Sequence, residues 1–562
     1  GEYKLIWFEW ANNQQILLSV RSHASNGEFS FSVTRLLLVD IESGEKRSVF
    51  SPKVLRRADW VPQLQDQIVD LLSDDPDHIL MTADLREFVV PDVYRVGLSS
   101  GKVELVKRGR PGVLNWLTDR QNRVRIGVFQ NETQFRIYEQ DVRGKNWRML
   151  WEFQALSKDY IDPLGFGADP NQLYINAYHR GRLAVFSVNL NDPDLSRELI
   201  YADDQRDVEG QLIYSETVKD VVGIHTGLRE GYVLWSEPHR RLVRSIDAAL
   251  PHTRNKILNF SDDEQRIVVL AENATNAGTY YVLRRDENRM TEIAQRYETL
   301  PSELMVGNQL VEFSARDGEK IQAFLTLPAG TEPSALPVVV LPHGGPISAD
   351  SGGFDYWTQL FANRGYAVIQ INFRGSSGYG YDFMAAGLQA WGLQMQDDVT
   401  DGTQWLINQG VADPDRICIV GGSYGGYAAL MGAAKAGHLY RCAVSFAGVA
   451  DLKAHVRQRR GFLNAEVVKK IVGETGRDLR ARSPITKVDQ IDIPVLLIHG
   501  DEDVRVAVDQ SRRMYRALKK SGKEVRYVEQ KNGGHFLSTN EQRLNALLEI
   551  ERFLDRHLRQ TQ

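Results

Sequence analysis

The sequence predicts a β-propeller over residues 1–300, followed by a doubly wound, mostly parallel α/β sheet over residues 301–562. Two observations predict this fold class. Short β-rich runs recur at a regular interval in the first part, as in the blades of a propeller. In the second part, continuous apolar strands alternate with segments long enough for a helix, which is typical of a parallel sheet covered on both faces.

The repeat of the first part consists of six β-rich runs, each of which follows a turn rich in Asn, Asp or Gln. They cover residues 15–18, 78–81, 123–126, 172–175, 220–223 and 266–269. Successive runs are separated by 63, 45, 49, 49 and 45 residues. Such a period, with several short strands per repeat, indicates propeller blades of four strands each. The longer first interval leaves room for an amphipathic insert at residues 60–72.

Two other architectures stay open for this part, an array of β-sandwiches or several separate small domains. The regular period and the lack of linker composition favour the propeller over both. The run at residues 4–8 (KLIWF) opens as though already inside a blade. We therefore expect the natural protein to have further residues upstream.

The composition is that of an ordinary globular protein. Hydrophobic residues make up 42% of the 562 residues and charged residues 25%, and the formal net charge is −5. These values argue against a disordered or fibrous chain and against nucleic acid as the main partner. The longest apolar runs fall far short of the roughly 20 residues that cross a bilayer. The first residues show no positive-then-apolar leader pattern, so we expect that any secretion signal has been removed or never existed, and the compartment stays open between cytoplasm and periplasm.

The chain has two cysteines, Cys418 and Cys442, which is too few for a disulfide framework. We expect two buried thiols. The alternative is a single bridge across neighbouring strands, since both cysteines precede or begin apolar runs in the same domain, provided that the protein is exported.

The second part opens with a predicted hairpin, formed by residues 310–313 and 321–327 around a turn. Five apolar strands follow, with helix-length segments between them. They cover residues 338–341, 365–372, 416–420, 442–446 and 494–498. This order predicts the doubly wound sheet of an α/β-hydrolase domain.

A nucleophile elbow is predicted at residues 421–425 (GGSYG). In a G-x-S-x-G motif the glycines permit a tight turn from strand to helix, which holds the serine in a strained conformation with its hydroxyl exposed. Here an apolar strand precedes the motif and a helical segment, residues 427–431, follows it. Ser423 is therefore the predicted nucleophile of a hydrolase that attacks a carbonyl carbon.

A serine nucleophile needs a base, and the base needs an acid, which follow it in the order Ser, acid, His in this fold. Three carboxylates, Asp501, Glu502 and Asp503, come directly after a predicted strand. His535 lies on a glycine-rich loop after the strand-like residues 525–529 and is the predicted base. This chemistry needs no metal or organic cofactor, so we expect none.

Two other histidines follow the elbow. His499 precedes the carboxylates at the end of the strand, and we interpret it as structural. His557 lies in the final helical segment and is expected at the surface.

The oxyanion site of this fold uses the backbone N–H after the nucleophile and another from the loop after an early strand. Tyr424 supplies the first of these groups. The second is expected from residues 342–346 (PHGGP), whose glycines let the backbone approach the substrate.

Together these motifs resemble the prolyl oligopeptidase family of serine peptidases, especially its acylaminoacyl-peptidase and dipeptidyl-peptidase branch. The resemblance spans both predicted domains. It rests on residues 343–346 (HGGP), 372–380 (NFRGSSGYG), 397–399 (DDV), 422–427 (GSYGGY), 499–503 and 534–535.

The resemblance implies roles for particular residues. It selects Asp503 as the acid, because the family places the acid three residues after the glycine that ends its strand. Two positions later, Arg505 is implied to bind a substrate carbonyl, with a solvated surface arginine as the alternative. His343 stands where prolyl oligopeptidase itself has a tyrosine that binds the oxyanion, so the implied donors are the N–H groups of Gly344 and Tyr424.

The resemblance also implies an S1 pocket built partly from Tyr424 and from residues 446–449, with Phe446 and Val449 favouring an uncharged P1 side chain. The same apolar residues are equally compatible with a core position. No acidic pair that would grip a free substrate amine could be matched in the sequence. Acylated or internal peptides therefore stay open beside dipeptidyl-peptidase substrates.

The predicted function is hydrolysis of short peptides through a Ser423 acyl-enzyme, with a propeller that limits access as the resemblance implies. The expected partners are short peptide substrates, with a homo-oligomer as an open possibility. One alternative is a carboxylesterase, which would use the same triad because ester and amide hydrolysis share the acyl intermediate. The other is a propeller binding module attached to an inactive hydrolase, which the presence of all three triad residues disfavours.

Overall fold

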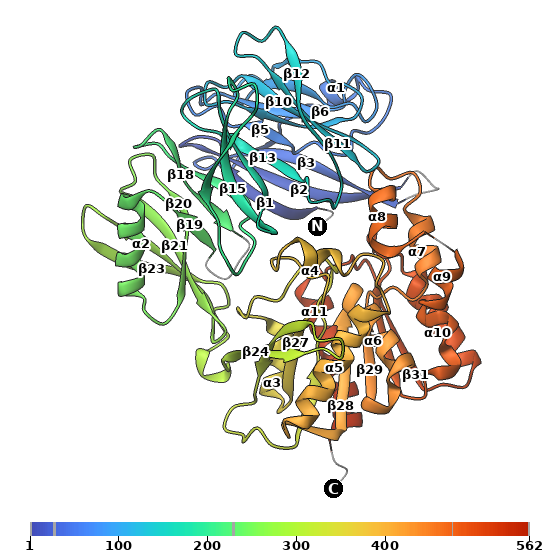
Figure 1. Ribbon diagram of the computed structural model, residues 1–562. Helices are drawn as coiled ribbons and strands as arrows, with labels where there is room; N and C mark the ends of the chain where they lie inside the picture. The colour runs from blue at the N-terminus through green and yellow to red at the C-terminus, as the bar shows by residue number, and fades with distance from the viewer. Residues whose placement is uncertain (1–2, 26–29, 227–230, 475, 560–562) are drawn as a thin grey trace. The chain divides into compact units, whose positions relative to one another are not determined.

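The computed structural model describes residues 3–25, 30–226, 231–474 and 476–559. Six small sheets make up the N-terminal part, and one eight-stranded sheet forms the core of the C-terminal part (Figure 1). The predicted fold class is confirmed, since the six sheets are the blades of a β-propeller and the large sheet has helices on both faces.

Consecutive strands are neighbours within each blade. The first blade consists of β1 (Lys4–Trp10), β2 (Gln15–Ser25), β3 (Ser30–Asp40) and β4 (Lys46–Ser48). The second consists of β5 (Ile68–Asp70), β6 (His78–Ala83), β7 (Asp92–Gly97) and β8 (Val103–Lys107). The third consists of β9 (Val113–Thr118), β10 (Val124–Asn131), β11 (Gln134–Gln140) and β12 (Trp147–Gln154). The long first interval contains the short helix α1 (Pro52–Leu55) and an irregular stretch before β5.

The fourth blade consists of β13 (Ile161–Phe166), β14 (Gln172–His179), β15 (Arg182–Asn189) and β16 (Arg197–Tyr201). The fifth consists of β17 (Gly210–Ser215), β18 (Asp220–Thr226) and β19 (Tyr232–Leu234). The sixth consists of β20 (Arg254–Phe260), β21 (Arg266–Asn273), β22 (Asn276–Arg284) and β23 (Arg289–Gln295). Each of the six predicted β-rich runs marks the beginning of the second strand of its blade.

The fifth blade departs from the predicted four strands. Within its described residues it has three, and after β19 the chain continues into the helix α2 (Glu237–Ala249). Pro238 lies in the first turn of α2, where its missing N–H costs nothing. The buried Ile246 and the partly buried Leu242 and Val243 pack against the apolar side chains of the fifth and sixth blades.

By compactness the chain divides into two units, Gly1–Ala177 with Phe186–Ile200, and Tyr178–Val185 with Tyr201–Gln562. The second unit therefore contains the fifth and sixth blades as well as the large sheet. Within this unit, the side-chain amide of Gln359 donates a hydrogen bond of 2.9 Å to the carbonyl oxygen of Ala274 in the sixth blade.

The large sheet has the strand order β24-β25-β27-β26-β28-β29-β30-β31. The strands are β24 (Asn308–Ser314), β25 (Lys320–Thr326), β26 (Leu336–Val340), β27 (Ala367–Asn372), β28 (Ala412–Gly422), β29 (Cys442–Phe446), β30 (Val495–Gly500) and β31 (Val525–Gln530). The first two form the predicted antiparallel hairpin, and β26 to β31 pair in parallel.

Helices follow the parallel strands. They are α3 (Tyr356–Asn363), α4 (Tyr381–Ala385), α5 (Gln394–Asn408), α6 (Tyr424–Lys435), α7 (Leu452–Gln458), α8 (Ala465–Val472), α9 (Gly476–Ala481), α10 (Asp509–Lys520) and α11 (Asn540–Leu558). Single-turn 3₁₀ helices lie at Ser302–Leu304, Gly437–Leu439, Pro484–Thr486 and Val488–Gln490.

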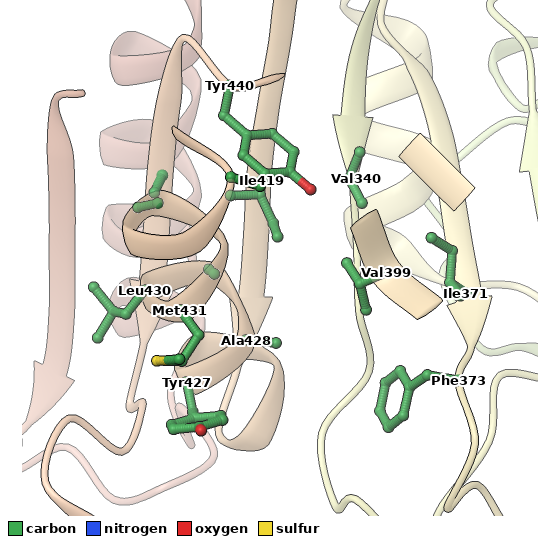
Figure 2. Close-up of a cluster of buried hydrophobic side chains, with 14 of the residues drawn as sticks. Val340, Ile371, Phe373, Val399, Ile419, Tyr427, Ala428, Leu430, Met431 and Tyr440 are labelled. Carbon is green, nitrogen blue, oxygen red and sulfur yellow. The ribbon is translucent and has the colours of Figure 1, made fainter. Parts of the chain in front are cut away.

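Side chains alternate between the two faces of the sheet, as the two-residue period of a strand requires. Ile417 and Ile419 of β28 lie in the core beneath α5, α6 and α10, part of which Figure 2 shows. Cys418 and Val420 lie in the core beneath α3 and α11. Both faces are apolar because both are covered, which explains the continuous apolar runs in the sequence.

The expectation of two buried thiols is wrong, because Cys418 and Cys442 are joined by a disulfide. The two residues are directly opposite in the register of the neighbouring strands β28 and β29, with Cα atoms 4.8 Å apart. The alternative of a bridge between neighbouring strands is the one observed. No described helix combines the length and the apolar composition needed to cross a membrane.

Candidate active site

Ser423 forms the junction between β28 and α6 and has the backbone angles φ 58° and ψ −117°. A positive φ is uncommon for a residue with a side chain and marks local strain of the kind found at functional sites. The turn depends on Gly425, because a Cβ at this position would lie 2.1 Å from the carbonyl oxygen of Pro342. The predicted nucleophile elbow is thus present in the structure.

The loop of residues 342–346 packs against this elbow. A Cβ built on Gly344 would lie 3.5 Å from the Cβ of Ser423, so the two backbones are close neighbours. Tyr424 begins α6, where backbone N–H groups have no partner within the helix. Among the described residues, neither the N–H of Gly344 nor that of Tyr424 has a hydrogen-bond acceptor. Both are therefore available to an oxyanion.

His343 supports the conformation of the loop of residues 342–346 through contacts on both sides of its ring. Its Nδ1 lies 2.7 Å from the carbonyl oxygen of Gly344 and its Nε2 lies 2.9 Å from the hydroxyl oxygen of Ser376. Its ring stacks on Phe373 with 4.3 Å between ring centroids. Burial lowers the pKa of His343 to about 4, so the imidazole is neutral at pH 7.

Asp503 and His535 lie on the loops after β30 and β31, which are neighbouring parallel strands. The Nδ1 atom of His535 is 2.6 Å from Oδ2 of Asp503. The other carboxylate oxygen accepts the backbone N–H groups of Arg505 and Val506, at 2.8 and 2.9 Å. Burial acts to raise the pKa of Asp503, but hydrogen bonds from His499 and His535 outweigh it and hold this pKa well below its usual range. Asp503 is therefore an anion at neutral pH.

The structure thus brings Asp503 and His535 together, and it places Gly344 beside Ser423. Within the described residues, no hydrogen bond joins the Ser423 hydroxyl to His535. Nucleophile–base contacts are often long in the absence of substrate and shorten in the Michaelis complex.

Arg505 is exposed, and its guanidinium lies over the ring of Phe536 at 4.9 Å. The backbone carbonyl of Arg505 accepts a hydrogen bond from Arg459, which links the loop to the end of α7. The side chain of Arg505 is therefore held on an aromatic surface next to His535. Phe536 was not singled out from the sequence, where it is only one apolar residue in a glycine-rich loop.

The three residues implied for the S1 pocket are almost fully buried, with 1% of Tyr424, 8% of Phe446 and 1% of Val449 exposed. The carbonyl oxygen of Phe446 accepts the N–H of Ser423 at 2.8 Å, and its ring lies 5.8 Å from that of Trp357. The Tyr424 ring lies against Trp391, with centroids 4.6 Å apart. Tyr424 and Val449 belong to the core on one face of the sheet, and Phe446 belongs to the core on the other face.

A buried ion pair supports the region around the oxyanion loop. Arg374 donates from Nε and Nη2 to the two carboxylate oxygens of Asp398, at 2.8 and 2.6 Å, and from Nη1 to Asp317. Arg374 directly follows Phe373, so the pair fixes the end of β27 where that ring meets His343. In the sequence these residues appeared only as parts of the motifs 372–380 and 397–399.

His455 on α7 is a further residue that sequence reasoning did not single out. It is 8% exposed, and its ring stacks on Trp391 at 6.4 Å. Burial lowers its pKa to about 4, with the charges of Arg459 and His535 acting in the same direction. In the described part of the chain, no group of three or more His, Cys, Asp or Glu side chains is placed to hold a metal ion.

Residues 353–561, which include Ser423, Asp503 and His535, match the prolyl oligopeptidase family. The resemblance to this family that the sequence motifs carry is thereby confirmed. The chain is accordingly a serine-type peptidase.

Named relatives of this peptidase agree with the family. A dipeptidyl aminopeptidase BIII from Pseudoxanthomonas mexicana is 28% identical over 96% of this chain and 78% of its own length. The acylamino-acid-releasing enzyme of Rattus norvegicus is also 28% identical, over 42% of this chain and 34% of its own length. The chain thus spans about a third of the rat enzyme.

A solved structure confirms the fold of the peptidase. A puromycin-hydrolyzing peptidase from Mycobacterium tuberculosis superimposes with a TM-score of 0.74, at 16% identity, over 99% of this chain and 95% of the other. At this identity the likeness concerns the fold alone.

Proposed function

We propose that this peptidase hydrolyses short peptides through an acyl-enzyme on Ser423. The observation that carries the proposal is the strained backbone of Ser423 at the start of α6, beside the N–H groups of Gly344 and Tyr424, which have no acceptor among the residues that the structure describes. A strained serine between two free backbone donors is the arrangement that acyl transfer requires.

The proposed roles follow from this geometry. His535 takes the proton of the Ser423 hydroxyl as the serine attacks the peptide carbonyl, and later gives it to the leaving amine. Asp503 accepts the Nδ1–H of His535, which directs Nε2 toward the serine and stabilises the imidazolium. Gly344 and Tyr424 donate to the oxyanion, and each such donor typically contributes about a hundredfold to a thousandfold in rate.

Water hydrolyses the acyl-enzyme by the same route in reverse, with His535 as the base. No step uses a metal or an organic cofactor. We propose Arg505 as the group that binds a substrate carbonyl, because a guanidinium is always charged and its position over Phe536 holds it next to the base. Phe446 and Val449 remain proposed as walls of an apolar S1 pocket under Tyr424.

The substrate class is proposed from the relatives. Their names indicate dipeptides released from a free amino end in one case and acylated amino acids in the other. We propose that the substrates are short peptides of one of these two types. We also propose that the boundary between the propeller and the hydrolase domain lies near residue 300. The carboxylesterase alternative has no observation that favours it.

Turnover of three substrates tests the proposal. They are a short peptide amide with a free amino end, the same peptide with an acetylated end, and a p-nitrophenyl ester. We expect hydrolysis of at least one peptide, with the Ser423→Ala variant folded but inactive. Hydrolysis of the ester alone would support the carboxylesterase, and equal activity of Ser423→Ala would overturn the assignment of the nucleophile.

A further inference from the structure

His499 is the second-last residue of β30 and is fully buried. Its Nε2 atom lies 2.9 Å from the carbonyl oxygen of Val506 and 3.2 Å from Oδ2 of Asp503. Its Nδ1 atom lies 2.7 Å from the hydroxyl oxygen of Ser511 on α10. The fully buried imidazole therefore contacts the buried carboxylate of the proposed catalytic acid.

These partners determine where the proton lies. The carbonyl oxygen of Val506 and the carboxylate of Asp503 can only accept, so Nε2 of His499 must carry a hydrogen. Nε2 donates to the carbonyl of Val506 and faces Oδ2 of Asp503, and Nδ1 shares a second hydrogen bond with the hydroxyl of Ser511.

The carboxylate of Asp503 consequently has four polar neighbours. Oδ1 accepts two backbone N–H groups, Oδ2 accepts the hydrogen bond of His535, and Nε2 of His499 lies 3.2 Å from the same Oδ2. Two imidazoles thus share one oxygen, and His499 limits rotation of the carboxylate about its Cβ–Cγ bond. A carboxylate that rotates freely would direct His535 toward the nucleophile for only part of the time.

The charged and titratable groups around this pair are few. Glu529 is directly opposite His499 in the register of β31 and is bound by Arg512 of α10, at 2.6 Å. On the α7 side, His455 and Arg459 lie near Asp503. None of the hydrogen bonds described for these groups goes to Asp503, so within the described structure His535 is its side-chain hydrogen-bond donor and His499 is the second imidazole in contact with it.

We propose that His499 is a positioning residue for peptide hydrolysis, which holds Oδ2 of Asp503 in the orientation that aligns His535. This role goes beyond the structural interpretation made from the sequence. The proposal rests on the proposed triad of Ser423, Asp503 and His535. It names His499 as a residue that acts through Asp503 and does not touch the substrate.

A pair of amide substitutions separates this role from simple packing. In His499→Gln the side-chain NH₂ reaches the position of Nε2 and can donate to both Val506 and Asp503. In His499→Asn the amide ends near Nδ1 and can meet Ser511 but not Asp503. We expect His499→Asn to lower kcat about 10- to 100-fold with KM nearly unchanged, because the variant loses the polar contact to the charged Asp503. His499→Gln should stay within about threefold of the original enzyme.

The pH profile of kcat/KM supplies a second readout. A carboxylate that has lost one donor holds the proton of the neighbouring imidazole more strongly. The acidic limb of the profile should therefore move to higher pH in His499→Asn and stay in place in His499→Gln. If His499→Asn does not fold, Ser511→Ala is measured in its place, because it keeps the histidine and removes one of its partners. The acidic limb of Ser511→Ala should move in the same direction, by a smaller amount.

Two outcomes would overturn the proposal. One is full activity of His499→Asn with an unchanged profile. The other is an equal loss in both amide variants that follows their melting temperatures. Ser423→Ala and Asp503→Asn are measured as controls for the triad. Full activity in either of them would refute the proposed triad. If both have lost activity, the results for the His499 variants test the positioning role alone.

Discussion

The Nδ1 atom of His535 lies 2.6 Å from Oδ2 of Asp503, and 9% and 0% of the two side chains are exposed. At this distance and burial the hydrogen bond is charge-assisted and orients the imidazole. Replacing Asp503 with Asn would favour the wrong tautomer of His535 without changing the size of the side chain. We expect kcat to fall by about three to four orders of magnitude. Steady-state kinetics checks this, with the exposed Glu502→Gln as control; loss in both variants would contradict it.

Arg505→Met keeps the aliphatic stem over Phe536 and removes the charge. If Arg505 binds a substrate carbonyl in the ground state and the transition state alike, KM should rise about tenfold with kcat within a few-fold of the original. Peptide kinetics at low and high substrate concentration separates the two constants. Arg556→Met on α11 is the matched control, and an unchanged KM in Arg505→Met would leave Arg505 a surface residue.

His343 and His455 make folding sensitive to acid. Burial lowers the pKa of each to about 4, whereas an unfolded histidine titrates near 6.5. Between these values the unfolded chain binds protons that the folded chain does not. Stability is therefore fully present above pH 6.5 and is lost as the pH falls toward 4, by at most about 3 kcal/mol per histidine.

Urea unfolding from pH 7 to pH 4, followed by circular dichroism, measures this dependence. The replacement His455→Phe removes one titrating group and keeps a ring against Trp391. Its unfolding midpoint should fall less steeply with acid than that of the original chain. Identical slopes would show that His455 does not titrate in this range.

The Arg374–Asp398 ion pair should be worth far more than a surface pair. Asp398 is fully buried and Arg374 nearly so, and Asp398→Ala would leave a guanidinium without one of its two partners. We expect a loss of about 3–5 kcal/mol in the free energy of unfolding. Asp415→Ala breaks the exposed pair with Arg441 and should cost less than about 1 kcal/mol. Equal losses in denaturant titrations would refute the distinction.

The Cys418–Cys442 disulfide closes a loop with a sequence separation of 24 residues. Restricting the unfolded chain by a loop of this length contributes about 3 kcal/mol. The double variant Cys418→Ala, Cys442→Ala should therefore unfold at lower urea concentration. Thiol titration of the unreduced, unfolded chain should find no free thiol, and two free thiols would contradict the bridge.

The parts of the fold that were predictable are those in which local sequence carries a geometric constraint. The elbow at Ser423 needs Gly425 because Pro342 leaves no room for a side chain. The two-sided sheet shows as continuous apolar strands because both faces are covered. The blades show as a period because each one repeats the same turn and strand.

The parts that were missed depend on which residues meet in space. The disulfide needs Cys418 and Cys442 opposite each other, and register cannot be read from one strand. In the fifth blade the helix α2 follows the three described strands where a fourth strand was expected, and its apolar side chains pack against the fifth and sixth blades. The helical pattern of this segment was missed because the sequence on both sides of it is β-rich. His499 has the same neighbours in sequence whether or not it faces Asp503, so its contact with Oδ2 became visible only in the structure.

Attack of Ser423 on the substrate carbonyl is the step on which the other proposed roles depend. Covalent labelling with a fluorophosphonate, followed by mass spectrometry of the digested protein, tests it most directly. We expect one phosphonylated residue, Ser423, with labelling that disappears in Ser423→Ala and slows strongly in Asp503→Asn. Labelling at another residue, or no labelling of a folded protein that still hydrolyses peptides, would contradict it.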